Sequence, residues 1–305
     1  MEWEQIKTEN RNSRTESIDA LDTLEMVRLI NEEDAKVALA IQSELVHVAS
    51  AVDIIVGQMR KGGRLVYSGC GTSGRLGVLD AAECPPTYST DPGQVIGLIA
   101  GGNCAMFCAV EGAEDNGALG AADLKEIHFS AADVLVGLAA SGRTPYVLGA
   151  LEYAKELGAH TIGITCCPGS PLALAAEVAI TPEPGPEVVT GSTRMKSGTA
   201  QKMVLNMLST CAMIKLGKVY GNLMVDVQPT NEKLIQRCKS IESQAAKVSI
   251  EVAEGALEQC DYRPKVAIAM LLCGVDAVEA KKLLEHCEGS IARVVSERAH
   301  KEERR

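Results

Sequence analysis

The stretch Ser68–Tyr88 reads SGCGTSGRLGVLDAAECPPTY and follows a short apolar run, RLVYSG at residues 64–69, that is typical of a buried strand. Glycines and hydroxyl side chains open the stretch, and a helical pattern follows them. Pro85 and Pro86 are expected to stop that helix near Cys84, because proline lacks an amide hydrogen and restricts the residue before it. A strand, a loop and a helix in this order form the first part of a βαβ unit.

The same order repeats along the chain. Four further strand-like runs occupy residues 95–102, 134–142, 160–166 and 178–183, with helical patterns after several of them. Strands that alternate with helices predict an α/β fold, a doubly wound and mostly parallel five-stranded sheet. A helical pattern precedes the sheet at residues 22–63, and residues 1–20 are polar and expected to be extended, where they can wrap a partner subunit.

The last part of the chain lacks strand patterns. Three short helices are predicted at residues 263–274, 276–289 and 290–300. We therefore expect one domain over residues 1–238, which contains the sheet and the N-terminal helices, and a small three-helix domain over residues 239–305.

Composition excludes several classes of protein. The net charge of −10 disfavours binding to nucleic acid or to an anionic membrane, and aromatic residues, at 3%, are too few for a base-stacking surface. The longest apolar run, residues 203–214, is too short and too polar to span a bilayer, and the charged N-terminus is not a signal-peptide pattern. Eleven cysteines without a Cys-x-x-Cys pair, and scattered histidines, predict no metal site and a reducing cytoplasm.

The loop at Ser68–Arg75 has the features of an anion site. Glycines let a backbone approach an anion closely, and the N–H groups at a helix start favour negative charge. The spacing matches neither Gly-x-Gly-x-x-Gly nor the P-loop, so a phosphomonoester fits better than a nucleoside triphosphate. An ordinary strand-to-helix turn is the alternative. The candidate binding residues are Gly71, Thr72, Ser73 and Gly74.

Two more stretches resemble this loop in composition. Residues 139–145 follow another strand, and residues 190–199 precede a nearly all-apolar helix. Because the carboxyl ends of parallel strands share one edge of a sheet, two hydroxyl-rich loops there predict a sugar-phosphate site. The basic residues of the third stretch could equally form a solvated face or an ion pair. The candidates are Ser141, Gly142, Arg143, Thr144, Ser192, Thr193, Arg194 and Lys196.

Longer runs carry a family resemblance. GCGTSGRLGVLDAAECPPTY at residues 69–88, GPEVVTGSTRMKSGTAQKMVLNML at 185–208 and GKVYGNLMVDVQPTNEKL at 217–234 resemble the N-acetylmuramic acid 6-phosphate etherases, within the sugar isomerase (SIS) family of phosphosugar-binding domains. The resemblance covers roughly residues 8–235, and the helical tail more loosely. One departure is Cys70, which stands where a smaller residue would pack more easily.

The resemblance implies a SIS-type, flavodoxin-like fold and a cytoplasmic homodimer with its site near the subunit interface. It implies a small-molecule sugar phosphate as ligand, with no nucleic-acid or membrane partner. The implied reaction cleaves the D-lactyl ether of N-acetylmuramic acid 6-phosphate to N-acetylglucosamine 6-phosphate and D-lactate, in the recycling or catabolism of cell-wall amino sugar.

Such a cleavage needs a base for the C2 proton, an acid for the leaving oxygen and a phosphate anchor, but no metal or redox cofactor. Glu83 is the candidate proton donor, because the negative end of a helix dipole disfavours a charged carboxylate. Glu114 is carried over from the family as base or water activator; alone it would be taken for part of an exposed acidic cluster. The division of the two roles stays open.

Glu83 raises a question of distance. Ten residues of helix from Ser73 cover ~15 Å, which is longer than a sugar phosphate. Either Glu83 serves the partner subunit's site, or the helix is shorter than the pattern indicates.

Two other functions use a similar site. A non-catalytic sugar-phosphate sensor would need neither Glu83 nor Glu114, and a sugar-phosphate isomerase would move the C2 proton without expelling a group from C3.

Overall fold

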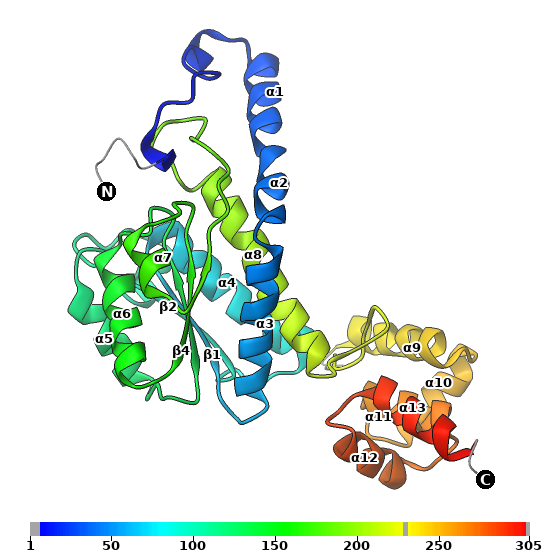
Figure 1. The fold of residues 1–305 in the computed structure, drawn as a ribbon. Helices are drawn as coiled ribbons and strands as arrows, with labels where there is room; N and C mark the ends of the chain where they lie inside the picture. Colours follow the sequence, from blue (N-terminus) through cyan, green and yellow to red (C-terminus); the bar gives the residue numbers. More distant parts are fainter. Residues whose placement is uncertain (1–6, 228–230, 303–305) are drawn as a thin grey trace. The chain divides into compact units, whose positions relative to one another are not determined.

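Five parallel strands lie at the centre of the first of two compact units in this computed structural model, which describes residues 7–227 and 231–302 (Figure 1). The strands run in the order β2-β1-β3-β4-β5, and all pairs are parallel. Each lies within a run that the sequence predicts as a strand, so the expected doubly wound sheet is confirmed. Their bounds are β1 Leu65–Gly69, β2 Val95–Ile99, β3 Val134–Leu138, β4 His160–Ile164 and β5 Val178–Ile180.

Helices cover both faces of this sheet, with α5, α6 and α7 on one side and α3, α4 and α8 on the other (Figure 1). Every residue of β1 and of β3 is buried, as expected for parallel strands between two helical layers. The helices with residues in this unit are α1 Thr23–Asp34, α2 Lys36–Gln42, α3 Leu45–Met59, α4 Gly71–Tyr88, α5 Gly117–Glu126, α6 Pro145–Glu156, α7 Pro171–Ala175 and α8 Lys196–Lys215.

The segment before α1 is less extended than its composition predicts. Residues 1–6 lie outside the described part, and short 3₁₀ turns form at η2, Lys7–Glu9, and η3, Ile18–Ala20. A third such turn, η4 at Asn103–Met106, follows β2.

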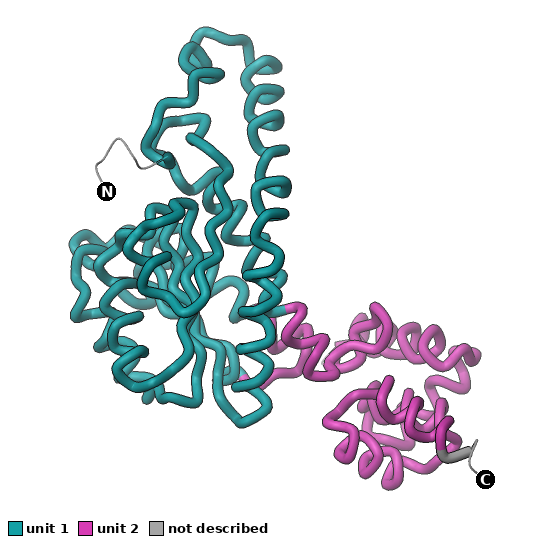
Figure 2. Tube along the Cα trace, in the orientation of Figure 1, with its two compact units in different colours: residues 1–82, 92–209 teal, residues 83–91, 210–305 magenta. Residues whose placement is uncertain are grey.

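The second compact unit comprises Glu83–Asp91 and Thr210–Arg305 (Figure 2). Its core consists of Val, Ile, Leu, Ala, Met and Cys side chains. The three helices expected from the sequence are present as α11, α12 and α13, and α9 and α10 precede them. The bounds are β6 Val219–Tyr220, β7 Leu223–Met224, α9 Glu232–Ala246, α10 Ile250–Glu258, α11 Pro264–Cys273, α12 Ala277–His286 and α13 Ile291–Glu302.

The limits of the two compact units do not decide whether a domain boundary lies between residues 238 and 239. That boundary stays a prediction. Within the described ranges, no single helix is long and apolar enough to cross a membrane; only the pair Thr23–Gln42 and Leu45–Met59, bent by 63°, has the length and composition.

Candidate functional site

The strand order reverses between β1 and β3, which makes the carboxyl ends of these two strands the switch point of the sheet. The two strands pair directly, with Gly69 opposite Leu138. The loop before the body of α4 follows β1, and the loop before α6 follows β3, so the two glycine- and hydroxyl-rich loops are neighbours. Open α/β sheets bind their ligands at this position.

The first loop is shaped by glycines. Gly71 has a φ of +51°, a region that favours glycine, and a Cβ placed there would meet no atom within 4 Å. A Cβ on Gly74 would lie 2.6 Å from the Gly69 oxygen, so the start of α4 can pack this closely only without a side chain. The open side at Gly71 gives a ligand access to the first N–H groups of α4, which have no acceptor within the helix.

The second loop holds Glu114. The Thr144 hydroxyl donates to Glu114 Oε1 at 3.2 Å, and the Tyr146 amide donates to the Glu114 backbone oxygen at 3.1 Å. The turn itself needs Gly142, whose φ is +66° and whose added Cβ would lie 2.1 Å from Ser170 Oγ. The structure therefore attaches the candidate base, an exposed residue, to the candidate binding loop.

Cys70 lies between β1 and the first loop, where the charge of the Glu114 carboxylate acts on its thiol. Burial raises the pKa of its thiol to about 12, and the negative charges of Glu114 and Asp115 act in the same direction. A thiol with this pKa stays protonated at neutral pH, so Cys70 is unsuited to be a nucleophile. Its side chain instead packs against the core between the sheet and α6.

The third stretch also reaches the first loop. A Cβ on Gly198, in the first turn of α8, would lie 3.4 Å from Thr72 Cγ2 and 3.6 Å from the Thr193 backbone oxygen. One turn further along, Gln201 Oε1 accepts a hydrogen bond of 2.8 Å from the Ser73 hydroxyl. The start of α8 thus borders the loop after β1.

Lys196 is engaged elsewhere. Its ammonium group donates to Glu33 Oε2 at 2.7 Å, and both side chains are 1% exposed. The sequence leaves an ion pair open as one alternative to ligand binding for the basic residues of this stretch, and Lys196 forms such a pair. Arg194 is exposed, which fits the other alternative, a solvated face. Binding of phosphate by these two residues stays a prediction.

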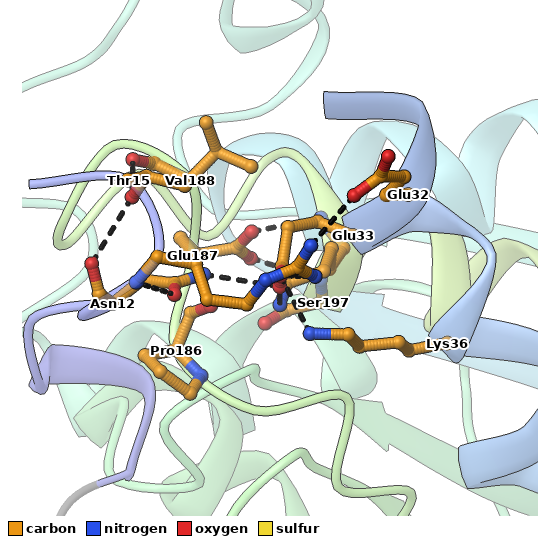
Figure 3. Close-up of polar contacts among 11 residues, drawn as sticks. Asn12, Thr15, Glu32, Glu33, Lys36, Pro186, Glu187, Val188 and Ser197 are labelled. Atoms are coloured by element: carbon orange, nitrogen blue, oxygen red, sulfur yellow. Dashed lines mark hydrogen bonds and ion pairs between the residues drawn. The ribbon is translucent and has the colours of Figure 1, made fainter. Parts of the chain in front are cut away.

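Glu33 gathers several donors besides Lys196 (Figure 3). It accepts hydrogen bonds from Asn12, Arg14 and Lys36, at 3.0, 2.9 and 2.5 Å. Burial alone would raise the pKa of Glu33, but the hydrogen bonds from Lys196, Lys36 and Asn12 outweigh it and lower the pKa to about 2. The cluster joins the N-terminal segment to the start of α8.

A second buried carboxylate fixes the same helix start. Both oxygens of Glu187 accept backbone hydrogen bonds of 2.9 Å, from the amides of Lys196 and Ser197 (Figure 3). Glu187 thereby satisfies amides that the first turn of α8 leaves without intrahelical acceptors. Sequence reasoning missed Glu33, Glu187 and Gln201, because their partners lie far away along the chain or, for Glu187, across an irregular loop.

Glu83 lies inside α4 and not at the end of the helix, where the sequence predicts it. The prediction that Pro85 and Pro86 end the helix is wrong, because α4 continues through both prolines to Tyr88. The Ser89 amide donates to the Pro85 oxygen at 2.9 Å, and the Ser89 hydroxyl donates to the Asp226 backbone oxygen, contacts that hold the last turn. Glu83 is exposed and belongs to the second compact unit, whereas Glu114 belongs to the first.

No group of three or more potential metal-binding side chains occurs within residues 7–227 and 231–302. All eleven cysteines fall in the described ranges, and all are free thiols.

The sequence was compared with protein-family models and with curated proteins. The model of the glucokinase regulatory protein N-terminal SIS domain matches residues 47–155, and that of the SIS domain matches residues 121–210. The N-acetylmuramic acid 6-phosphate etherase of Photorhabdus laumondii is 58% identical over 289 residues, 95% of this chain and 96% of that protein. The protein of the same name from Escherichia coli O9:H4 (strain HS) is 57% identical over 295 residues, 97% and 99% of the two chains.

Two solved structures each match less than two thirds of the chain. A phosphoheptose isomerase from Neisseria gonorrhoeae is 18% identical with a TM-score of 0.47, and covers 62% of this chain and 97% of its own. A putative phosphosugar isomerase from Bacteroides fragilis is 23% identical with a TM-score of 0.47, and covers 65% and 94%.

Proposed function

The chain belongs to the N-acetylmuramic acid 6-phosphate etherase family, and we propose that it cleaves the D-lactyl ether of N-acetylmuramic acid 6-phosphate to give N-acetylglucosamine 6-phosphate and D-lactate. The observation that carries this proposal is identity of 56–58% with curated etherases over nearly the whole chain. The enzyme is then a carbon–oxygen lyase. The neighbouring loops at the switch point, with a carboxylate attached to one of them, support the same reaction.

The phosphate is held by the two loops. Backbone amides at the start of α4 and the hydroxyls of Thr72 and Ser73 are donors for the phosphate oxygens. Ser141, Gly142, Arg143 and Thr144 form the second side of the site, and Ser192, Thr193 and Arg194 extend it. Lys196 stays a proposed ligand of the phosphate as well, and its ion pair with Glu33 also holds the start of α8. Local donors are needed because a protein with a net charge of −10 does not attract anions as a whole.

The reaction begins on the open-chain sugar, whose C1 aldehyde acidifies the proton on C2. A base removes that proton, the electron pair forms a C2=C3 double bond, and the bond between C3 and the lactyl oxygen breaks. An acid protonates the leaving oxygen, and D-lactate departs. Water then adds to the double bond, its hydroxyl group to C3 and a proton to C2.

Glu114 is the proposed base or water activator. It is exposed at the site, and the Thr144 hydroxyl fixes one of its oxygens. A positioned carboxylate acting on an acidified proton contributes about 10² to 10⁴ in rate.

Glu83 is the proposed proton donor, and we propose that it acts in the site of the partner subunit of a homodimer. Along α4, Glu83 lies ten residues from Ser73, about 15 Å at the rise of an α-helix. This separation supports a site shared between subunits, in which one chain supplies Glu114 and the loop at Ser68–Arg75, here called the phosphate loop, and the other supplies Glu83.

We also propose that the enzyme works in the cytoplasm, in recycling or catabolism of cell-wall amino sugar. Eleven free cysteines support a reducing compartment.

The test is release of D-lactate from N-acetylmuramic acid 6-phosphate by the purified protein. Lactate should appear with the wild type, and Glu83→Ala and Glu114→Ala should each lower kcat by roughly 10² to 10⁴. Glu111→Ala, which changes an exposed glutamate in the same acidic cluster, is the matched control and should retain full activity. Tight binding of the substrate without any lactate would instead favour the sensor function.

A further inference from the structure

Gln201 is a buried amide with an unmet hydrogen bond. Its side chain is 0% exposed, and its Oε1 accepts the hydrogen of the Ser73 hydroxyl at 2.8 Å. Its Nε2 is buried and has no hydrogen-bond partner among the described residues. A buried donor without an acceptor is costly, so its presence beside the phosphate loop needs a physical reason.

The face of α8 that carries Gln201 has a second group of this kind. Ser197 lies four residues earlier and therefore on the same side of the helix. Its hydroxyl is also buried and makes no hydrogen bond to an oxygen or nitrogen within residues 7–227 and 231–302, and it lies beside the Cys166 thiol. Gly198, between the two, lies against Thr72. The part of α8 that borders the phosphate loop is thus polar, buried and incompletely hydrogen-bonded.

The Ser73 hydroxyl has one hydrogen to give. While it donates to Gln201 Oε1, it offers a ligand only lone pairs, and a phosphate dianion has no hydrogen to place on them. A half turn of the Gln201 amide exchanges Oε1 for Nε2. The amide then donates to Ser73 Oγ, and the Ser73 hydrogen becomes available for a phosphate oxygen.

We propose that Gln201 is a positioning residue for the phosphate of the substrate. Its amide turns when the phosphate binds, which changes Ser73 from a donor to Gln201 into a donor to the ligand. The role rests on the proposed function of the loop as a sugar-phosphate site, and it adds a residue that touches the ligand only through Ser73.

Binding of N-acetylglucosamine 6-phosphate, measured by calorimetry, tests the role without requiring turnover. Gln201→Glu introduces a carboxylate that only accepts hydrogen bonds, so the Ser73 hydroxyl keeps donating its hydrogen to this side chain and not to the phosphate. Gln201→Met, of similar length, leaves the Ser73 hydroxyl without a partner. We expect Kd to rise by roughly tenfold to a hundredfold for Gln201→Glu at pH 8, and by a few-fold for Gln201→Met.

The pH dependence separates this role from a purely structural one. A protonated carboxyl can donate to Ser73 as an amide does, so the Kd ratio of Gln201→Glu to Gln201→Met should widen as pH rises from 5.5 to 9. The carboxylate of Gln201→Glu also repels the phosphate, so the same ratio is measured in a Ser73→Ala background, where only that repulsion remains. A ratio that does not change with pH would overturn the proposal. A ratio that widens equally in both backgrounds would also overturn the proposal.

A double-mutant cycle covers the case in which Gln201→Glu does not fold. In a Ser73→Ala background, Gln201→Met should not change Kd further, because the hydroxyl that Gln201 positions is gone. The same change in Kd in both backgrounds would overturn the role of Gln201. A wild type that binds no N-acetylglucosamine 6-phosphate would contradict the proposed function itself, and with it this role.

Discussion

At the scale of single residues, the buried carboxylate of Glu33 should make stability depend on pH. Its pKa is lowered from 4.5 to about 2 in the folded chain, so its contribution is present above pH 4.5 and is lost as pH falls toward 2. Glu33→Gln should destabilise the protein by roughly 3 kcal/mol at pH 7. Urea unfolding should show this difference narrowing by about 1 kcal/mol between pH 5.5 and pH 3.5.

Glu32→Gln is the control for that series. Glu32 is the neighbouring residue, is mostly exposed and pairs only with Arg14 among the described contacts. It should change the free energy of unfolding by less than about 1 kcal/mol, as exposed pairs do. A difference between wild type and Glu33→Gln that is the same at pH 5.5 and pH 3.5 would contradict the interpretation.

Glu242 should have the opposite effect. Its carboxyl is 0% exposed, neither oxygen has a partner in the described residues, and burial raises its pKa to about 9. The unfolded chain ionises this group above pH 4.5 and the folded chain does not, so stability falls as pH rises from 4.5 toward 9. Thermal or urea unfolding should therefore show the stability of Glu242→Met rising relative to that of the wild type by roughly 4 kcal/mol from pH 5 to pH 8.

The matched substitution is Glu258→Met, at an exposed glutamate of the same unit. It should not alter the pH dependence. A wild type and a Glu242→Met variant whose stabilities run parallel between pH 5 and pH 8 would show that Glu242 ionises normally.

At the scale of elements, α4 shows where a propensity rule fails. Proline disfavours a helix interior because it removes one N–H bond, yet Pro85 and Pro86 lie inside α4. Tertiary contacts hold the last turn: Cys84 is buried, and Ser89 bonds to the backbone of Asp226. Pro85→Ala restores a donor for the Ala81 carbonyl, so the free energy of unfolding should rise by about 1 kcal/mol or more, measured by urea unfolding. A loss of stability would contradict this account of the helix end.

The strands and helices differ in how well the sequence pattern predicts them. The five strands could be predicted because each lies in a short run of mostly apolar residues, and buried parallel strands need little else. α9 was missed because it is mostly polar and buries only Cys238, Ile241 and Glu242. A pattern of consecutive apolar residues does not detect such a helix.

At the scale of the whole molecule, parallel strands made half of the candidate site predictable. The carboxyl ends of β1 and β3 meet at one edge, so the loops after them had to be neighbours. Contacts of long sequence separation could not be foreseen: Glu33 meets Lys196 across 163 positions, and Ser73 meets Gln201 across 128. Side-chain types alone do not determine which distant polar groups will pair.

A site shared between two subunits predicts complementation. Glu83→Ala and Glu114→Ala homodimers should both be inactive. Mixed dimers of the two variants contain one site with both carboxylates and one with neither, so they should recover about half of the wild-type activity per dimer. Mixed dimers as inactive as either parent would contradict the shared site and would place both glutamates in one subunit's site.

The most direct test of the central claim is the position of solvent hydrogen after turnover of N-acetylmuramic acid 6-phosphate in D₂O. Removal of the C2 proton followed by addition of water predicts D-lactate without carbon-bound deuterium, and N-acetylglucosamine 6-phosphate with deuterium at C2, which NMR detects. Lactate released with hydrogen retained at C2 would contradict the elimination, and no lactate at all would contradict the etherase function.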